Sequence, residues 1–146
     1  MEAPRSFEAP RTESFVESLQ SPEAAIDAVS AELERRFDAL SEAPATCELQ
    51  GRQWECAGDT RRELIGHLQE RVVAVSTLRD EVVAVNQAAT AGSPAERATY
   101  EAVKWLSAEA VIIENELLST CKRFEQADLE ERAATRRSAA DVPVTA

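Results

Sequence analysis

The sequence predicts an all-α protein, either a three-helix bundle or an elongated antiparallel helical hairpin of coiled-coil type, with a short N-terminal helix and disordered tails. Glycine is scarce, with 4 residues among 146, and 29% of the residues are charged, a composition typical of long helices. Apolar residues also recur at steps of three and four along three segments. We therefore expect a mobile N-terminal arm over residues 1–20, a helical bundle over 21–137 and a disordered tail over 138–146.

The first helix is expected over residues 21–42. Ser21 is a good N-cap, and Pro22 suits the first helical position, where its missing N–H would have no partner. Glu32 and Arg36 form a favourable pair four residues apart, on a different face from the apolar residues. The apolar face that we expect to be buried consists of Ile26, Val29, Leu33, Phe37 and Leu40.

The segment 43–58 is the least regular part of the chain. Gly51 and Gly58 interrupt it, and Trp54 lies between them. We interpret this segment as a connection that contains a short turn of helix.

The second helix is expected over residues 60–90, and it opens with a capping box formed by Thr60 and Glu63. The tetrad Val-Val-Ala-Val occurs twice, at 72–75 and 82–85, so this stretch also fits a β-hairpin. We favour the helix because no Gly, Asn or Pro separates the two tetrads to form a turn. Its apolar face consists of Ile65, Leu68, Val72, Val75, Leu78, Val82 and Val85.

The third helix is expected over residues 93–135, again with a capping box, formed by Ser93 and Glu96. The short turn before it makes the second and third helices antiparallel neighbours. The third helix is longer than the first, so its apolar residues extend beyond what the first helix covers. Either the N-terminal arm and the segment 43–58 cover them, or another chain does. These apolar residues, here called the seam, are Val103, Leu106, Ala110, Ile113, Leu117, Thr120, Phe124 and Ala127.

This difference in length predicts a non-catalytic interaction protein, a scaffold or adaptor subunit that docks through the third helix. The partner is another protein, in a hetero-complex or a homo-oligomer. Trp105 lies beside the seam, and a large aromatic side chain suits such an interface. The residues expected to bind the partner are Val103, Trp105, Leu106, Ile113, Leu117 and Phe124.

Charge and composition argue against several other classes of function. A net charge of −11 is unfavourable for nucleic-acid binding, which depends on Lys and Arg. No apolar run approaches the roughly 18 residues of a membrane span. No Gly-rich loop is present to bind phosphate. We therefore expect no nucleic-acid partner, no membrane span, no cofactor and no enzymatic activity.

The cysteines are three, an odd number that does not suggest a disulfide scaffold. We interpret them as buried or incidental thiols, which favours a reducing compartment, the cytoplasm or the nucleus. Together with His67, the cysteines could form a metal site, but Cys47, Cys56 and Cys121 lack the close pairs typical of zinc ligands. Cys56 and His67 would be the candidates for a nucleophilic pair, and a surface position for His67 is the simpler interpretation.

The predicted helix–turn–helix is followed by Phe124, three further residues and Asp128. This arrangement resembles the small helical-hairpin substrates of type VII secretion systems, which carry an aromatic residue, three residues and an acid after the hairpin. Here the aromatic residue is Phe rather than Tyr, and Trp54 is not followed by the Trp-x-Gly turn of that group. The resemblance implies an alternative function, as a substrate or partner of a type VII-like secretion system.

Overall fold

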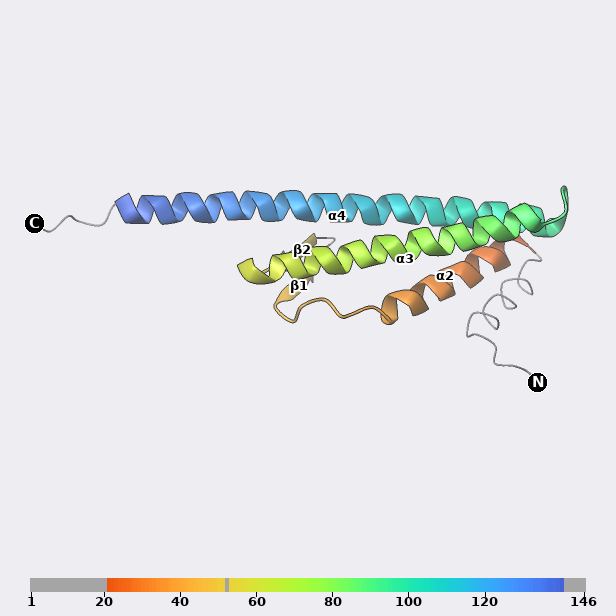
Figure 1. Ribbon diagram of the computed structural model, residues 1–146, viewed down its shortest axis with the longest axis horizontal. Coiled ribbons are helices and arrows are strands. Elements are labelled where there is room, and N and C mark those ends of the chain that lie inside the picture. Colours follow the sequence, from red (N-terminus) through yellow and green to blue (C-terminus); the bar gives the residue numbers. More distant parts are fainter. Residues whose placement is uncertain (1–20, 52, 141–146) are drawn as a thin grey trace, which may run out of the picture.

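The computed structural model describes residues 21–51 and 53–140, and these form three α-helices and one β-hairpin. Figure 1 shows α4 as the longest element, with α3 antiparallel to it, α2 packed beside both, and the hairpin next to the beginning of α3. The predicted all-α bundle is confirmed in its three helices. The elements are α2 (Pro22–Asp38), β1 (Cys47–Gln50), β2 (Gln53–Cys56), a 3₁₀ turn (Gly58–Thr60), α3 (Arg61–Ala88) and α4 (Pro94–Ala140).

The helix bounds differ from the predicted ones by a few residues. The helix α2 ends at Asp38, four residues before its expected end, whereas α4 continues to Ala140, five residues beyond its expected end. The predicted N-terminal arm and the residues after Ala140 lie outside the described residues. No described helix is both long enough and apolar enough to cross a membrane.

The helix α2 begins as predicted, because the Ser21 hydroxyl accepts a hydrogen bond from the backbone N–H of Ala24 at 3.2 Å. Its buried face includes Val29 and Leu33, as expected, and also Glu32, whose side chain has no exposed surface. The predicted pair of Glu32 with Arg36 is present at 2.8 Å. The spacing predicts a face away from the apolar residues for this pair, but the Glu32 side chain is buried in the core.

A chain of charges therefore connects α2 with α3. Arg36 donates to Glu32 and, with its other nitrogens, to both carboxylate oxygens of Glu81 on α3, at 2.7 and 3.1 Å. Arg35 also pairs with Glu32. Burial by itself would raise the pKa of Glu32, but the hydrogen bonds and charges of Arg36 and Arg35 outweigh it and hold this pKa below its ordinary value of 4.5.

This lowered pKa predicts a pH-dependent contribution to stability. A carboxylate whose pKa is lower in the folded state stabilises the fold above its unfolded pKa, and the contribution is lost as the pH falls through the folded value. We expect Glu32→Gln to lower the free energy of unfolding by about 1–3 kcal/mol at pH 7, and the difference from wild type to shrink steadily below pH 4.5. Urea unfolding at pH 7, 5, 4 and 3 measures it. Glu34→Gln, at an exposed position of the same helix, is the control, and a difference that does not change with pH would contradict the assignment.

The turn between α3 and α4 is fixed by polar contacts. Gly92 has a φ of 79°, which favours glycine. Ser93 accepts the N–H of Glu96 at 3.1 Å, as the predicted capping box requires, but the Glu96 carboxylate accepts from the N–H of Gly92 rather than from that of Ser93. Asn86 near the end of α3 donates to the Thr99 hydroxyl at 2.9 Å, which holds the two helices together. The antiparallel arrangement predicted from the short turn is present.

Residues 72–85 lie within α3, so the helical prediction for the two valine tetrads is correct.

One main core joins the three helices. Small residues of α4 contribute to this core alongside large ones, which lets the helices approach closely. The buried members are Ala25, Val29, Leu33, Val75, Leu78, Val82, Ala98, Ala102, Leu106, Ala110 and Ile113.

The beginning of α3 differs from the prediction. Thr60 has helical backbone angles and caps no N–H, because the 3₁₀ turn ahead of it leads directly into α3. Its hydroxyl donates instead to the carbonyl of Ala57 at 2.8 Å. The predicted capping box of Thr60 with Glu63 is therefore absent.

The segment 43–58 contains a β-hairpin, with helical character only in the 3₁₀ turn that begins at Gly58, so our interpretation as an irregular connection is wrong. The strands pair antiparallel, with Cys47 opposite Cys56 and Leu49 opposite Trp54. Gly51, at the turn, has a φ of 62°, a value that primed hairpin turns require and glycine adopts readily. Two strands of four residues are marginal alone, so the hairpin depends on its contacts with the helices.

Candidate protein-interaction surface

The seam on α4 is covered by other parts of this chain. Leu106 and Ile113 are buried in the main core, and Phe124 is buried in a second cluster with Leu64 and Leu68 of α3 and the hairpin residue Cys47. Of the other residues expected to bind a partner, Val103 and Trp105 pack against the main core and Leu117 packs against the second cluster, all three half-buried. The segment 43–58 thus covers the far part of the seam, one of the two alternatives that the sequence left open.

The hairpin is held against α4 by polar contacts of its second strand. The indole N–H of Trp54 donates to the Glu116 carboxylate at 3.1 Å, while the ring is half-buried in the second cluster. Arg123 of α4 donates to Gln53 at 2.7 Å and forms an ion pair with Glu55. Because Glu55 lies opposite Glu48 in the hairpin, this ion pair offsets a repulsion between the two strands.

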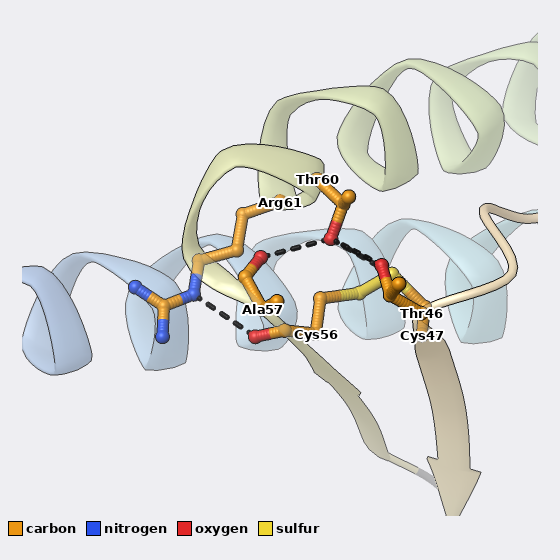
Figure 2. The surroundings of a disulfide bond; sticks show 6 residues. All are labelled: Thr46, Cys47, Cys56, Ala57, Thr60 and Arg61. Carbon is orange, nitrogen blue, oxygen red and sulfur yellow. Dashed lines mark hydrogen bonds between the residues drawn. A yellow bond between two sulfur atoms is a disulfide. The ribbon is translucent and has the colours of Figure 1, made fainter.

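Arg61 joins the hairpin, α3 and α4 at one point. Figure 2 shows its guanidinium donating to the carbonyl of Cys56, a bond of 3.3 Å. The same guanidinium forms ion pairs with Asp128 and with Glu131, the latter at 3.0 Å, and lies over the ring of Phe124 at 5.6 Å from its centroid. The hydrogen bond that Arg61 donates to the Glu131 carboxylate is the largest cause that holds the pKa of Arg61 above its ordinary value. Both residues of the resemblance, Phe124 and Asp128, are thus engaged within the chain.

Cys47 and Cys56 form a disulfide that closes the base of the hairpin. Figure 2 shows this bond beside the hydroxyls of Thr46 and Thr60, which are hydrogen-bonded to each other at 3.0 Å. Our interpretation of these two cysteines as incidental thiols is therefore wrong. Cys121, half-buried on α4, is the free cysteine of the described residues.

The candidate metal site and the candidate nucleophilic pair are not assembled in the described residues. Within residues 21–51 and 53–140, no three His, Cys, Asp or Glu side chains lie close enough together to hold a metal ion. Cys56 is in a disulfide and has no thiol to pair with His67. His67 itself is half-buried rather than on the surface, and its Nδ1 is enclosed without a hydrogen-bond partner in the described part of the chain.

A second set of apolar side chains on α4 is exposed. In the described part of the chain, seven large hydrophobic side chains are more than half exposed, and five of them belong to α4. Ile112 lies beside the hairpin, where it lines an open pocket with Leu49, Trp54 and Glu116. The other four, here called the outer face of α4, are Tyr100, Val111, Leu118 and Leu129.

The outer face lies away from the rest of the bundle. At 100° per residue its four side chains fall within roughly 20° of one another around the helix, and the seam residues Leu106, Ile113 and Phe124 lie roughly 130–150° away. In Figure 1, α2, α3 and the hairpin all lie on one side of α4. This set does not stand out in the sequence, because its spacing of 11, 7 and 11 residues is sparser than the steps of three and four that mark the seam.

Comparison of this chain with protein-family models, with curated proteins and with solved structures finds no match.

Proposed function

We propose that this chain is a non-catalytic interaction protein, a scaffold or adaptor that binds another polypeptide through the outer face of α4. The observation that carries the proposal is the concentration of exposed apolar side chains on one helix: Tyr100, Val111, Leu118 and Leu129 are each 53–59% exposed. Exposed apolar side chains that gather on one face of a folded protein mark an interaction surface when they form a large patch. The docking element is the long third helix that the sequence indicated, but the proposed contact residues differ.

The alternative function as a type VII-like secretion substrate receives less support. Its two marker residues, Phe124 and Asp128, are held by Arg61, and Phe124 is only 5% exposed. A receptor that recognises the ring of Phe124 would first have to displace Arg61 from it. The outer face requires no such rearrangement.

The disulfide favours one kind of cellular compartment for this function over another. The cytoplasmic expectation depends on three free thiols, and two of these cysteines are paired. Disulfides persist mainly in oxidising compartments. We therefore favour an exported or otherwise oxidising location for the proposed binding function.

The function is tested by affinity capture from the native source with the full-length tagged chain. We expect wild type and the control Val73→Ser, an exposed position on α3, to retain the same bound proteins, counting untagged copies of this chain among them. Val111→Ser with Leu118→Ser should reduce that capture at least tenfold, because it removes the apolar centre of the surface. The readout is quantitative mass spectrometry. Identical capture by all three chains would refute binding through this face.

A further inference from the structure

An open pocket lies between the hairpin and the two long helices. Its volume is about 540 Å³, within the range of about 300–1,000 Å³ that is typical of ligand pockets. The hairpin lines it with Leu49 and Trp54, which are opposite each other in the two strands. The helix α4 lines it with Ile112 and, three and four residues later, with Asn115 and Glu116. This spacing places the three side chains on one face of α4.

The apolar part of the pocket is incompletely covered. The Leu49 side chain is 53% exposed and that of Ile112 is 51% exposed, although the ring of Trp54 is half-buried. Apolar side chains from two elements that line one pocket offer contact to an apolar group of a ligand. Because the pocket is open, it suits one side chain of a longer molecule better than a small molecule that must be enclosed.

The helix α3 adds Arg71, and with it a positive charge. Four arginines of the described residues are half-buried, and three of them, Arg36, Arg61 and Arg79, have a carboxylate oxygen within 4.0 Å. Arg71 has no such partner in the described part of the chain, and it lies over the ring of Phe37, 4.6 Å from the centroid. Stacking of this kind leaves the N–H donors in the plane of the guanidinium free. Such a partly desolvated guanidinium is suited to binding a carboxylate.

Glu116 narrows the chemistry of the ligand. Its carboxylate accepts the indole N–H of Trp54 at 3.1 Å, and no ion pair joins it to Arg71 within residues 21–51 and 53–140. A free phosphate would be repelled by this carboxylate, whereas a peptide has backbone N–H groups that can donate to it. The Asn115 side chain is exposed, and its amide can donate to a peptide carbonyl.

From these contacts we infer that the pocket binds a peptide that carries a carboxylate next to an apolar side chain. The carboxylate pairs with Arg71, and the apolar side chain lies between Leu49 and Ile112. A backbone N–H of the peptide donates to Glu116. The carboxylate belongs to an acidic side chain or to the end of a chain, and the experiment distinguishes these two sources. This site goes beyond the proposed function, because none of the residues of the outer face of α4 lines the pocket.

The first test is an NMR titration of the isotope-labelled full-length chain with two probe peptides. One probe, acetyl-Gly-Leu-Asp-Gly-amide, carries its carboxylate on a side chain, and the other, acetyl-Gly-Gly-Leu, has a free carboxyl end. At least one probe shifts the signals of the Trp54 indole N–H and the Asn115 side-chain amide, with a dissociation constant of about 1 mM or lower. The indole N–H of Trp105, which packs against the main core, does not shift. The probe that binds more tightly identifies the source of the carboxylate. Absence of a saturable shift with both probes overturns the inference.

The second test removes the charge on either side of the proposed ion pair. Arg71→Gln weakens binding of the tighter probe at least about tenfold, because it removes a charge-assisted hydrogen bond. The matched control Arg62→Gln makes the same change of charge at an exposed position nine residues earlier, on the opposite side of α3 at about 100° per residue, and leaves binding unchanged. A neutral probe, with Asn in place of Asp or an amide at the carboxyl end, loses a similar factor with wild type and nothing further with Arg71→Gln. Equal affinity of wild type and Arg71→Gln for the charged probe overturns the ion pair.

The third test addresses the apolar part of the pocket and does not depend on the contact of Arg71 with Phe37. Ile112→Ser weakens binding at least about fivefold, because it removes apolar surface that the ligand covers. The control Val73→Ser, at an exposed position of α3 that does not line the pocket, leaves binding unchanged. Circular dichroism and the unfolding midpoint check that both variants remain folded, as expected for positions this exposed. Binding that Ile112→Ser and Arg71→Gln both leave intact takes place elsewhere on the chain and refutes the site.

Discussion

Replacing Leu106 by alanine lowers the free energy of unfolding by about 2–5 kcal/mol, the range for removing a fully buried leucine from a packed core. The Leu106 side chain has no exposed surface and belongs to the buried core that also includes Val75 and Leu78 of α3 and Leu33 of α2. The change therefore leaves a cavity at the junction of the three helices. Urea unfolding followed by circular dichroism at 222 nm measures the effect.

The matched control is Leu118→Ala on the same helix. Leu118 is 59% exposed, so its replacement should change the stability of the monomer by no more than about 0.5 kcal/mol. It should weaken binding instead, whereas Leu106→Ala should affect binding only through loss of fold. Equal effects of the two changes on the stability of the folded chain would mean that Leu106 is not in the core and that the seam faces a partner.

The apolar spacing along α4 indicates which side of the helix is buried, but not what covers it. Steps of three and four identify the buried side of α4, and Leu106 and Ile113 are indeed on it. The spacing does not show which element covers that side. The seam is too long for its neighbouring helices alone, and the segment 43–58, which forms a hairpin packed on Phe124, covers the remainder.

The hairpin has a pattern in the sequence that is too short to stand out. Apolar and polar residues alternate in Cys-Glu-Leu-Gln and again in Gln-Trp-Glu-Cys, and Gly51 lies between them. Cys47 and Cys56 are also equally far from the turn, so they face each other in the register. Four residues per strand without valine or isoleucine give little β propensity, and alternation over so few residues arises easily by chance.

Glu32 could not be assigned from its residue type. Glutamate is almost never fully buried unless it is paired, and Glu32 is paired with Arg35 and Arg36 of its own helix, while Arg36 also reaches Glu81 on α3. The pair within α2 was predictable from its spacing of four residues. The burial of the Glu32 side chain results from the packing of α2 on its neighbours, which no local sequence pattern indicates.

Removing the disulfide by Cys47→Ala with Cys56→Ala lowers the free energy of unfolding by about 2–3 kcal/mol, the value for closing a loop of this size in the unfolded chain. The cysteines are nine residues apart, and alanine avoids placing an unpaired hydroxyl against Leu64 and Phe124. We also expect the fluorescence of Trp54 to shift to longer wavelength as the hairpin loosens from α4. Urea unfolding and tryptophan emission, each with and without dithiothreitol, measure both effects.

Three controls make this result specific to the bond. Dithiothreitol should destabilise wild type by the same amount as the double variant, and it should leave the double variant unchanged. Cys121→Ala, at the free cysteine, should keep the response of wild type to the reductant. Equal stability of oxidised and reduced wild type would show that the ion pair of Arg123 with Glu55 and the bond from Trp54 to Glu116 hold the hairpin without the disulfide.

The same bond decides between the two expectations for the compartment. Chains trapped with acid and alkylated under denaturing conditions should show one reactive thiol, that of Cys121, when they come from an oxidising location. Three reactive thiols would support the cytoplasmic expectation. In that case the hairpin would have to be stable without its covalent link, and Arg61, through its contacts with Cys56, Asp128 and Glu131, would become the main connection between the hairpin and the two long helices.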